Sequence, residues 1–150
     1  RNCSRVMLRA VAAHAPDVQP DGVLVSEMVA VRSELIAGLT VDPQFGPAFL
    51  VGLGGGDVER LRDVAMGLLP LDRGDCARLL GELADPRIRL LGGSEREALV
   101  AALDRVAAMA HDLAGALVEL DVNPLALAAD GRVLALDAVM DFAPATRPRT

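Results

Sequence analysis

The sequence predicts an α+β fold in which a mostly antiparallel sheet is packed by helices. Apolar residues recur at helical spacing in two central segments, and extended, β-rich runs are grouped before and after those segments. This grouping favours α+β over a regular alternation of strands and helices. The 150 residues, of which 52% are hydrophobic, are enough to bury one core.

Composition excludes several classes of function. A formal net charge of -6 repels a phosphate backbone, and 2% aromatic residues provide no platform for stacking bases, so no nucleic-acid partner is expected. No apolar run is long enough to cross a bilayer, so no membrane partner is expected either. All 15 basic residues are arginines, so any lysine that binds nucleotide phosphates must lie outside this chain.

Two cysteines, Cys3 and Cys76, have no second Cys or His at metal-ligand spacing. We predict that both are buried thiols in a protein of the reducing cytoplasm. The sequence does not begin with Met, and we expect it to be a piece of a longer protein.

The first half of the chain predicts a helix and then strands. Residues 1–15 carry apolar residues at helical spacing, and prolines follow them. Turn-forming residues fill positions 42–47, and a glycine-rich loop begins at Gly52. The predicted strands are Gly22–Val29, Glu34–Thr40, Ala48–Leu53 and, more weakly, Val58–Leu69.

The second half predicts two helices and a hairpin. One helix covers Gly74–Leu83 with Asp72 as its N-cap, and the next begins with a capping box between Ser94 and Glu97. The buried stripe of this second helix is expected to contain Leu99, Leu103, Val106, Ala110 and Leu113. The expected end of the chain consists of extended runs over Ala116–Val122, Leu125–Ala128 and Arg132–Met140, a hairpin turn at 129–131, and a disordered tail over 143–150.

Several motifs, taken in order, resemble one family. The DPQFGP stretch at 42–47, the glycines at 52–55 and the ELDVNPL stretch at 119–125 are the most specific of them. They resemble the C-terminal part of the ATP-grasp domain of NDP-forming acyl-CoA synthetases. This is the ADP-forming acetate–CoA ligase group, which is related to the succinyl-CoA ligase β subunit. The resemblance covers roughly residues 20 to 139, and it implies a partial ATP-grasp domain, the C-terminal subdomain, over 1–142.

The resemblance implies a nucleotide site that uses ATP and Mg²⁺. The implied reaction transfers phosphoryl groups between ATP, a histidine and an acyl phosphate on the way to acyl-CoA. Its implied partners are the remaining ATP-grasp half and the CoA-binding domains or subunit, and a homo-oligomer is left open. The implied roles are adenine binding by Glu27, Met28 and Val29, ribose binding by Glu34, phosphate binding by Gly54 and Gly55, Mg²⁺ ligation by Asn123 and Asp137, and an active-site carboxylate at Asp121.

Hairpin geometry gives a separate expectation for Asn123 and Asp137. A three-residue loop with Gly131 in the left-handed conformation sets Ala128 opposite Arg132, and Asn123 then lies opposite Asp137 on one face. A two-residue loop would turn Asn123 and Asp137 to opposite faces.

Alternatives remain at each position. The two glutamates also suit an exposed hairpin face, the glycines suit tight turns, and Asp137 suits a solvated position. Asp57, Glu59 and Asp63 suit a solvated charged edge. The sequence also departs from the family, which usually has an Arg-Gly pair where residues 90–94 have none, and an arginine where Val139 stands. The second hypothesis is therefore a catalytically degenerate ATP-grasp module with a nucleotide-sensing or structural role, and the third is an interaction domain without a ligand.

Overall fold

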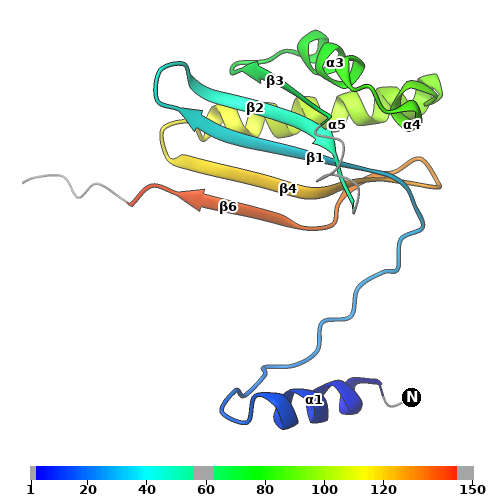
Figure 1. The fold of residues 1–150 in the computed structure, drawn as a ribbon, viewed down its shortest axis with the longest axis vertical. Coiled ribbons are helices and arrows are strands. Elements are labelled where there is room, and N and C mark those ends of the chain that lie inside the picture. Colours follow the sequence, from blue (N-terminus) through cyan, green and yellow to red (C-terminus); the bar gives the residue numbers. More distant parts are fainter. Residues whose placement is uncertain (1–2, 56–62, 145–150) are drawn as a thin grey trace, which may run out of the picture.

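A six-stranded antiparallel sheet with helices over one face forms the body of the protein (Figure 1). The computed structural model describes residues 3–55 and 63–144, and it confirms the α+β class. The elements in chain order are α1 (Cys3–His14), β1 (Val31–Asp42), β2 (Gly46–Leu53), β3 (Val64–Leu68), α3 (Arg73–Glu82), α4 (Pro86–Arg89), α5 (Gly93–Asp112), β4 (Leu117–Ala128), β5 (Val133–Ala135) and β6 (Ala138–Phe142).

The strands follow the order β3-β2-β1-β4-β5, and β6 also pairs with β4. The turn between β1 and β2 is fixed by Asp42, whose Oδ1 accepts hydrogen bonds from the amides of Gln44 (2.7 Å) and Phe45 (2.9 Å). Gly46 then has φ +84°, a conformation that favours glycine. The predicted turn at 42–47 is therefore confirmed.

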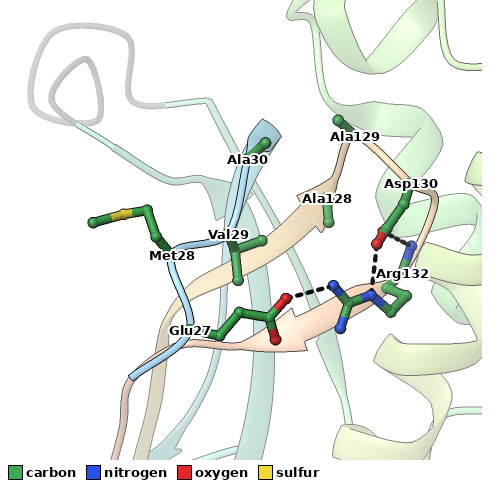
Figure 2. A pocket seen from close by; sticks show the side chains of 8 residues that line it. All are labelled: Glu27, Met28, Val29, Ala30, Ala128, Ala129, Asp130 and Arg132. Carbon is green, nitrogen blue, oxygen red and sulfur yellow. Dashed lines mark hydrogen bonds and ion pairs between the residues drawn. The ribbon is translucent and has the colours of Figure 1, made fainter. Parts of the chain in front are cut away.

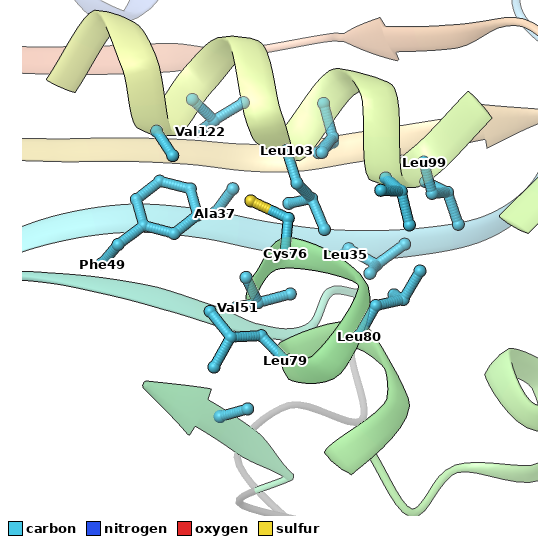
Figure 3. Packing of buried hydrophobic residues seen from close by; sticks show 14 of the residues in the cluster. Leu35, Ala37, Phe49, Val51, Cys76, Leu79, Leu80, Leu99, Leu103 and Val122 are labelled. Carbon is cyan, nitrogen blue, oxygen red and sulfur yellow. The ribbon is translucent and has the colours of Figure 1, made fainter. Parts of the chain in front are cut away.

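One face of the sheet packs against the helices and forms the core (Figure 3). Leu35 and Phe49 on neighbouring strands are fully buried, and they face Leu79, Leu99 and Leu103 of the helices. Because side chains alternate along a strand, the residues between the core positions of β1 lie on the opposite side of the sheet. We call that side, which the helices do not cover, the outer face.

Strand β4 contains a bulge at the point where the sequence predicts a break. Leu35 of β1 pairs with Leu125, while Ala37 pairs with Val122, so Asn123 and Pro124 both lie opposite the single residue Ile36. The extra residue lets Val122 and Leu125 both face the core although they are three positions apart. The two predicted runs thus form one strand with an irregularity.

The helix caps are partly as predicted. Asp72 is the N-cap of α3 and forms a capping box with Asp75. The capping box between Ser94 and Glu97 is wrong, because α5 begins at Gly93 and its N-cap is Gly92. The third helical residue is therefore Glu95, whose Oε2 accepts the Gly92 amide at 3.0 Å.

The stripe of α5 is largely confirmed. The buried residues include Leu99, Leu103 and Ala110, whereas Val106 and Leu113 are partly buried against the core.

The strand predicted at Gly22–Val29 is wrong. Residues 18–30 contain no helix or strand, because the β-rich run has no partner strand in the part of the chain that the structure describes. Helix α1 is confirmed, but none of its residues is buried, so Cys3 is exposed while Cys76 is buried as expected. Residues 56–62 and 145–150 lie outside the described residues, so the structure says nothing of the start of the run 58–69 or of most of the tail.

None of the helices within residues 3–55 and 63–144 has the length and apolar character needed to cross a membrane.

Candidate functional site

The segment that precedes β1 forms a pocket with the turn between β4 and β5 (Figure 2). The Ala129 amide donates to the Ala30 carbonyl at 2.8 Å, directly beyond the last β1–β4 pair, which joins Val31 to Ala128. The pocket measures about 220 Å³, and it is lined by Glu27, Met28, Val29, Ala30, Ala128, Ala129, Asp130 and Arg132. The three residues assigned to adenine by resemblance therefore share one cavity.

Arg132 forms ion pairs with two acidic residues of this pocket. Its Nη2 donates to Glu27 Oε1 at 2.9 Å, and its Nε donates to Asp130 Oδ2 at 2.7 Å. Hydrogen bonds to Glu27 and then to Asp130 raise the pKa of Arg132 above its ordinary value, and the same guanidinium lowers the pKa of Asp130. Arg132 and Asp130 are thus held in their charged forms at neutral pH.

A second pocket of about 220 Å³ brings together Glu34, Gly54 and Gly55. The Gly54 amide donates to the Glu34 carbonyl at 2.8 Å, which extends the pairing of β1 with β2. Gly55 has φ +84°, and a Cβ at this residue would lie 2.6 Å from Glu34 Oε2. A Cβ on Gly54 would lie 2.9 Å from the Leu35 carbonyl oxygen. Glycine at both positions is therefore what permits the close approach of the loop to Glu34.

Two arginines complete the lining of the second pocket. Arg32 pairs with Glu95 near the start of α5. Arg87 Nη2 donates to Asp85 Oδ2 at 2.9 Å, and these side-chain hydrogen bonds lower the pKa of Asp85 below its ordinary value. The wall of this pocket therefore contains charges of both signs.

Asp63 is not the solvated residue that the sequence suggests. Its Oδ2 accepts the amides of Ala84 (2.8 Å) and Asp85 (2.9 Å), so it holds the link between α3 and α4 beside the second pocket. Asp57 and Glu59 lie outside the described residues.

The terminal hairpin has the predicted three-residue loop. Gly131 has φ +87°, and the Ala128 amide donates to the Arg132 carbonyl at 2.8 Å. The pairs Leu125 with Ala135 in β5 and Val122 with Ala138 in β6 share one register.

That register sets Asn123 opposite Asp137. The Asn123 amide donates to the Asp137 carbonyl at 3.1 Å. Val122 faces the core, so Asn123 next to it lies on the outer face, and its side chain is exposed, as is that of Asp137. An amide oxygen and a carboxylate are the hard oxygen donors that Mg²⁺ prefers, so this donor set fits the ion.

The described residues contain no group of three or more His, Cys, Asp or Glu arranged to hold a metal. A Mg²⁺ ion at this pair would therefore take its other ligands from water and from a nucleotide.

Asp121 lies on the outer face beside this pair. Gly38 of β1 is directly opposite, and Val139 of β6 pairs with Asp121 on its other side. Asp121 lines a cavity of about 170 Å³ together with Gly38, Leu39, Thr40, Leu50, Glu119 and Leu120. The missing side chain at Gly38 contributes to this hollow, since a Cβ there would lie 2.8 Å from the Leu120 carbonyl oxygen.

The sequence did not point to Arg132 or to the turn residues Ala128 and Ala129 as part of a site. Arg132 and Glu27 are 105 positions apart, and only the pairing of β1 with β4 brings them together. A three-residue hairpin loop was the one available signal, because it places its flanking residues close to the start of β1.

Comparison with known proteins identifies the family of this chain. The ATP-grasp domain family matches residues 1–142. Subunit β of the ADP-forming acetate–CoA ligase II of Pyrococcus furiosus is 37% identical over 116 residues, covering 75% of this chain and 49% of that protein.

Two crystal structures of acetyl-coenzyme A synthetase 1 from Candidatus Korarchaeum cryptofilum are also similar. One contains coenzyme A, acetyl-coenzyme A and a phosphorylated phosphohistidine segment. It has a TM-score of 0.79 and 31% identity, covering 95% of this chain and 65% of that chain. The other contains coenzyme A and Mg-AMPPCP, with a TM-score of 0.64 and 33% identity, covering 78% of this chain and 55% of that chain.

The chain spans about half to two thirds of the length of these relatives. The family match covers nearly the whole chain, and the relatives agree with it. The chain therefore belongs to the ATP-grasp domain family, in the branch found in ADP-forming acetate–CoA ligases.

Proposed function

We propose that this chain is the nucleotide-binding C-terminal part of the ATP-grasp domain of an ADP-forming acyl-CoA ligase. The hairpin register carries the proposal, because it sets Asn123 opposite Asp137 on the same outer face as Glu34. Glu34 lies two residues along β1 from Ile36, which is opposite Asn123, so the two groups are about 7 Å apart along the strands. This spacing suits a nucleotide whose ribose lies at one group and whose outer phosphates lie at the other.

Each group takes the role that the family resemblance implies, and its chemistry suits that role. The Glu34 carboxylate accepts the ribose hydroxyls, and the backbone of Glu27–Val29 binds the edge of the adenine. The amides of Gly54 and Gly55 are available to phosphate oxygens. Asn123 and Asp137 hold Mg²⁺, which neutralises phosphate charge during transfer. Asp121, beside them in its cavity, is the carboxylate that contacts the reacting groups.

In the proposed reaction, a phosphoryl group passes between ATP, a histidine of the larger enzyme and an acyl phosphate, and acyl-CoA is the product. The histidine, the phosphate-binding lysine and the CoA site belong to parts of that enzyme beyond this chain. This chain's own residues bind and orient the nucleotide, and positioning of this kind accounts for most of the rate enhancement in phosphoryl transfer.

A direct test is calorimetric titration of ATP with Mg²⁺ into the complete enzyme that carries this chain, and into its variants. Glu34→Ala should weaken binding about tenfold or more, because a hydrogen-bonded charged group contributes roughly 1.5–3 kcal/mol. Glu82→Ala, an exposed glutamate on α3, is the matched control and should leave the affinity unchanged. Equal affinities of the two variants would contradict the ribose role.

A second titration addresses the metal pair. Asp137→Asn should reduce the gain in ATP affinity that Mg²⁺ provides, because one anionic ligand is lost. The role of Asp137 is wrong if this variant keeps the full effect of Mg²⁺.

One observation favours the second candidate, a module that binds nucleotide without catalysis. Val139, 61% exposed, pairs with Asp121 at a position where the family typically has an arginine, so a positive charge is absent beside the cavity of Asp121. Release of ADP that depends on an acid and CoA, measured in the complete enzyme, separates the two candidates. Nucleotide binding without such release supports the degenerate module.

A further inference from the structure

The segment Glu27–Ala30 is largely exposed and lies outside the helices and strands. Within it, Met28 is 94% exposed. Two hydrogen bonds join it to the β4–β5 turn. The Ala129 amide donates to the Ala30 carbonyl, and Arg132 donates to the Glu27 carboxylate (Figure 2). A segment with so little burial depends strongly on each remaining link.

The Arg132 side chain is itself oriented by the turn. Asp130 accepts the Arg132 backbone amide at 3.1 Å through Oδ1 and the Nε–H at 2.7 Å through Oδ2. The left-handed Gly131 closes the loop so that Asp130 and Arg132 come together. A planar guanidinium presents donors in a fixed fork, so Nε can bind Asp130 while Nη2 reaches Glu27.

We propose that Arg132 is a positioning residue of the nucleotide site, which fastens the segment Glu27–Val29 against the β4–β5 turn and so preforms the pocket for the base. The inference rests on the proposed function, since the base-binding role of this segment is part of that proposal. A preformed pocket favours binding because the ordering of the segment is completed before the ligand arrives. Arg132 acts through Glu27, and the proposal does not require it to contact the nucleotide.

The first test needs no ligand. Hydrogen exchange of the Ala129 amide in the full chain reports directly on its bond to Ala30. Arg132→Ala should accelerate this exchange by up to about fivefold, which corresponds to the upper end of the range for an exposed ion pair. Arg78→Ala breaks an equally exposed ion pair on α3 and should leave Ala129 unchanged. Unchanged exchange in Arg132→Ala would overturn the proposal.

A double-mutant cycle distinguishes loss of the Arg132–Glu27 link from disruption of the β4–β5 turn by the Arg132 substitution. Glu27→Ala removes the same link from a segment outside the helices and strands, so it should reproduce the acceleration. The double variant should exchange no faster than Arg132→Ala alone, because the link that Glu27→Ala removes is already lost in Arg132→Ala. Fully additive effects would mean that the two residues act separately, and would also overturn the proposal.

The second test compares ATP with inorganic tripolyphosphate, which has no base. Arg132→Ala should lower the affinity for ATP about threefold or more and leave the affinity for tripolyphosphate unchanged. Equal weakening of both ligands would indicate general charge attraction and contradict the positioning role. If the complete enzyme that carries this chain binds no ATP while Ala129 exchange still responds to Arg132, the fault lies with the proposed function and not with the fastening of the segment.

Discussion

Replacement of Gly55 by alanine tests how the glycine-rich loop supports Glu34. Gly55 has φ +84°, and its new Cβ would lie 2.6 Å from Glu34 Oε2, well inside the 3.4 Å at which ordinary contact begins. Gly46 provides a matched control, because it has the same φ and no atom within 4 Å of an added Cβ. The two substitutions therefore share the backbone strain and differ in what the methyl group meets.

The expected loss of stability follows from the backbone strain and from the contact of the new methyl group. A left-handed conformation costs an alanine about 1–2 kcal/mol at either position. At Gly55 the Glu34 carboxylate must also move, and a displaced rotamer costs about 0.5–1.5 kcal/mol. Urea denaturation should therefore find both variants destabilised. The free energy of unfolding of Gly55→Ala should be lower than that of Gly46→Ala by no more than about 1.5 kcal/mol, because the end of the long Glu34 side chain moves easily.

Nucleotide affinity should separate the variants much more. Displacement of Glu34 removes hydrogen bonds to a charged acceptor, so Gly55→Ala should bind ATP about tenfold more weakly, while Gly46→Ala should match the unaltered chain. Calorimetric titration with Mg²⁺ present measures both. The reasoning is refuted if the two variants bind ATP equally well, because Glu34 would then have moved without consequence.

Three further predictions concern the core and its charges. Phe49→Ala should lower the free energy of unfolding by about 3–5 kcal/mol in urea, whereas Phe45→Ala, 69% exposed, should change it by less than about 0.5 kcal/mol. Asp85 has a lowered pKa because of its hydrogen bonds to a neighbouring guanidinium, so its stabilisation is complete above about pH 4 and is lost as the pH falls further. The difference in Tm between the unaltered chain and Asp85→Asn should therefore shrink below pH 4. Burial raises the pKa of Cys76 to about 11, so iodoacetamide at pH 8 should alkylate Cys3 rapidly and Cys76 only after unfolding.

Local chemistry was sufficient to predict the terminal hairpin. The glycine of the Ala-Asp-Gly turn fixes the loop length, the loop length fixes the register, and the observed pairs follow it from Leu125 back to Glu119. The Asp72 cap and the core positions of α5 could be predicted for the same reason, since each depends on residues within one or two turns.

Features that depend on distant partners were not predictable. The run Gly22–Val29 has the composition of a strand, but composition cannot provide a neighbouring strand, and this run has none in the described parts of the chain. Asp63 looked solvated because the amides of Ala84 and Asp85 that it binds are more than 20 positions away. The predicted second capping box lies two residues too late in the chain, because Gly92 and Ser94 both suit an N-cap and the helix begins after the first of them.

The division of the sheet into two faces explains why the candidate site can vary while the fold is retained. The buried leucines of β1 and β4 belong to the core under the helices, whereas Asp121, Asn123 and Asp137 are exposed on the outer face. Substitutions of these three side chains should therefore change ligand binding with little effect on stability. Gly38 is the exception, because its absent side chain both opens the cavity of Asp121 and permits the close approach of the Leu120 carbonyl oxygen. Where fold and site share a position in this way, a loss of binding cannot be attributed to the site alone.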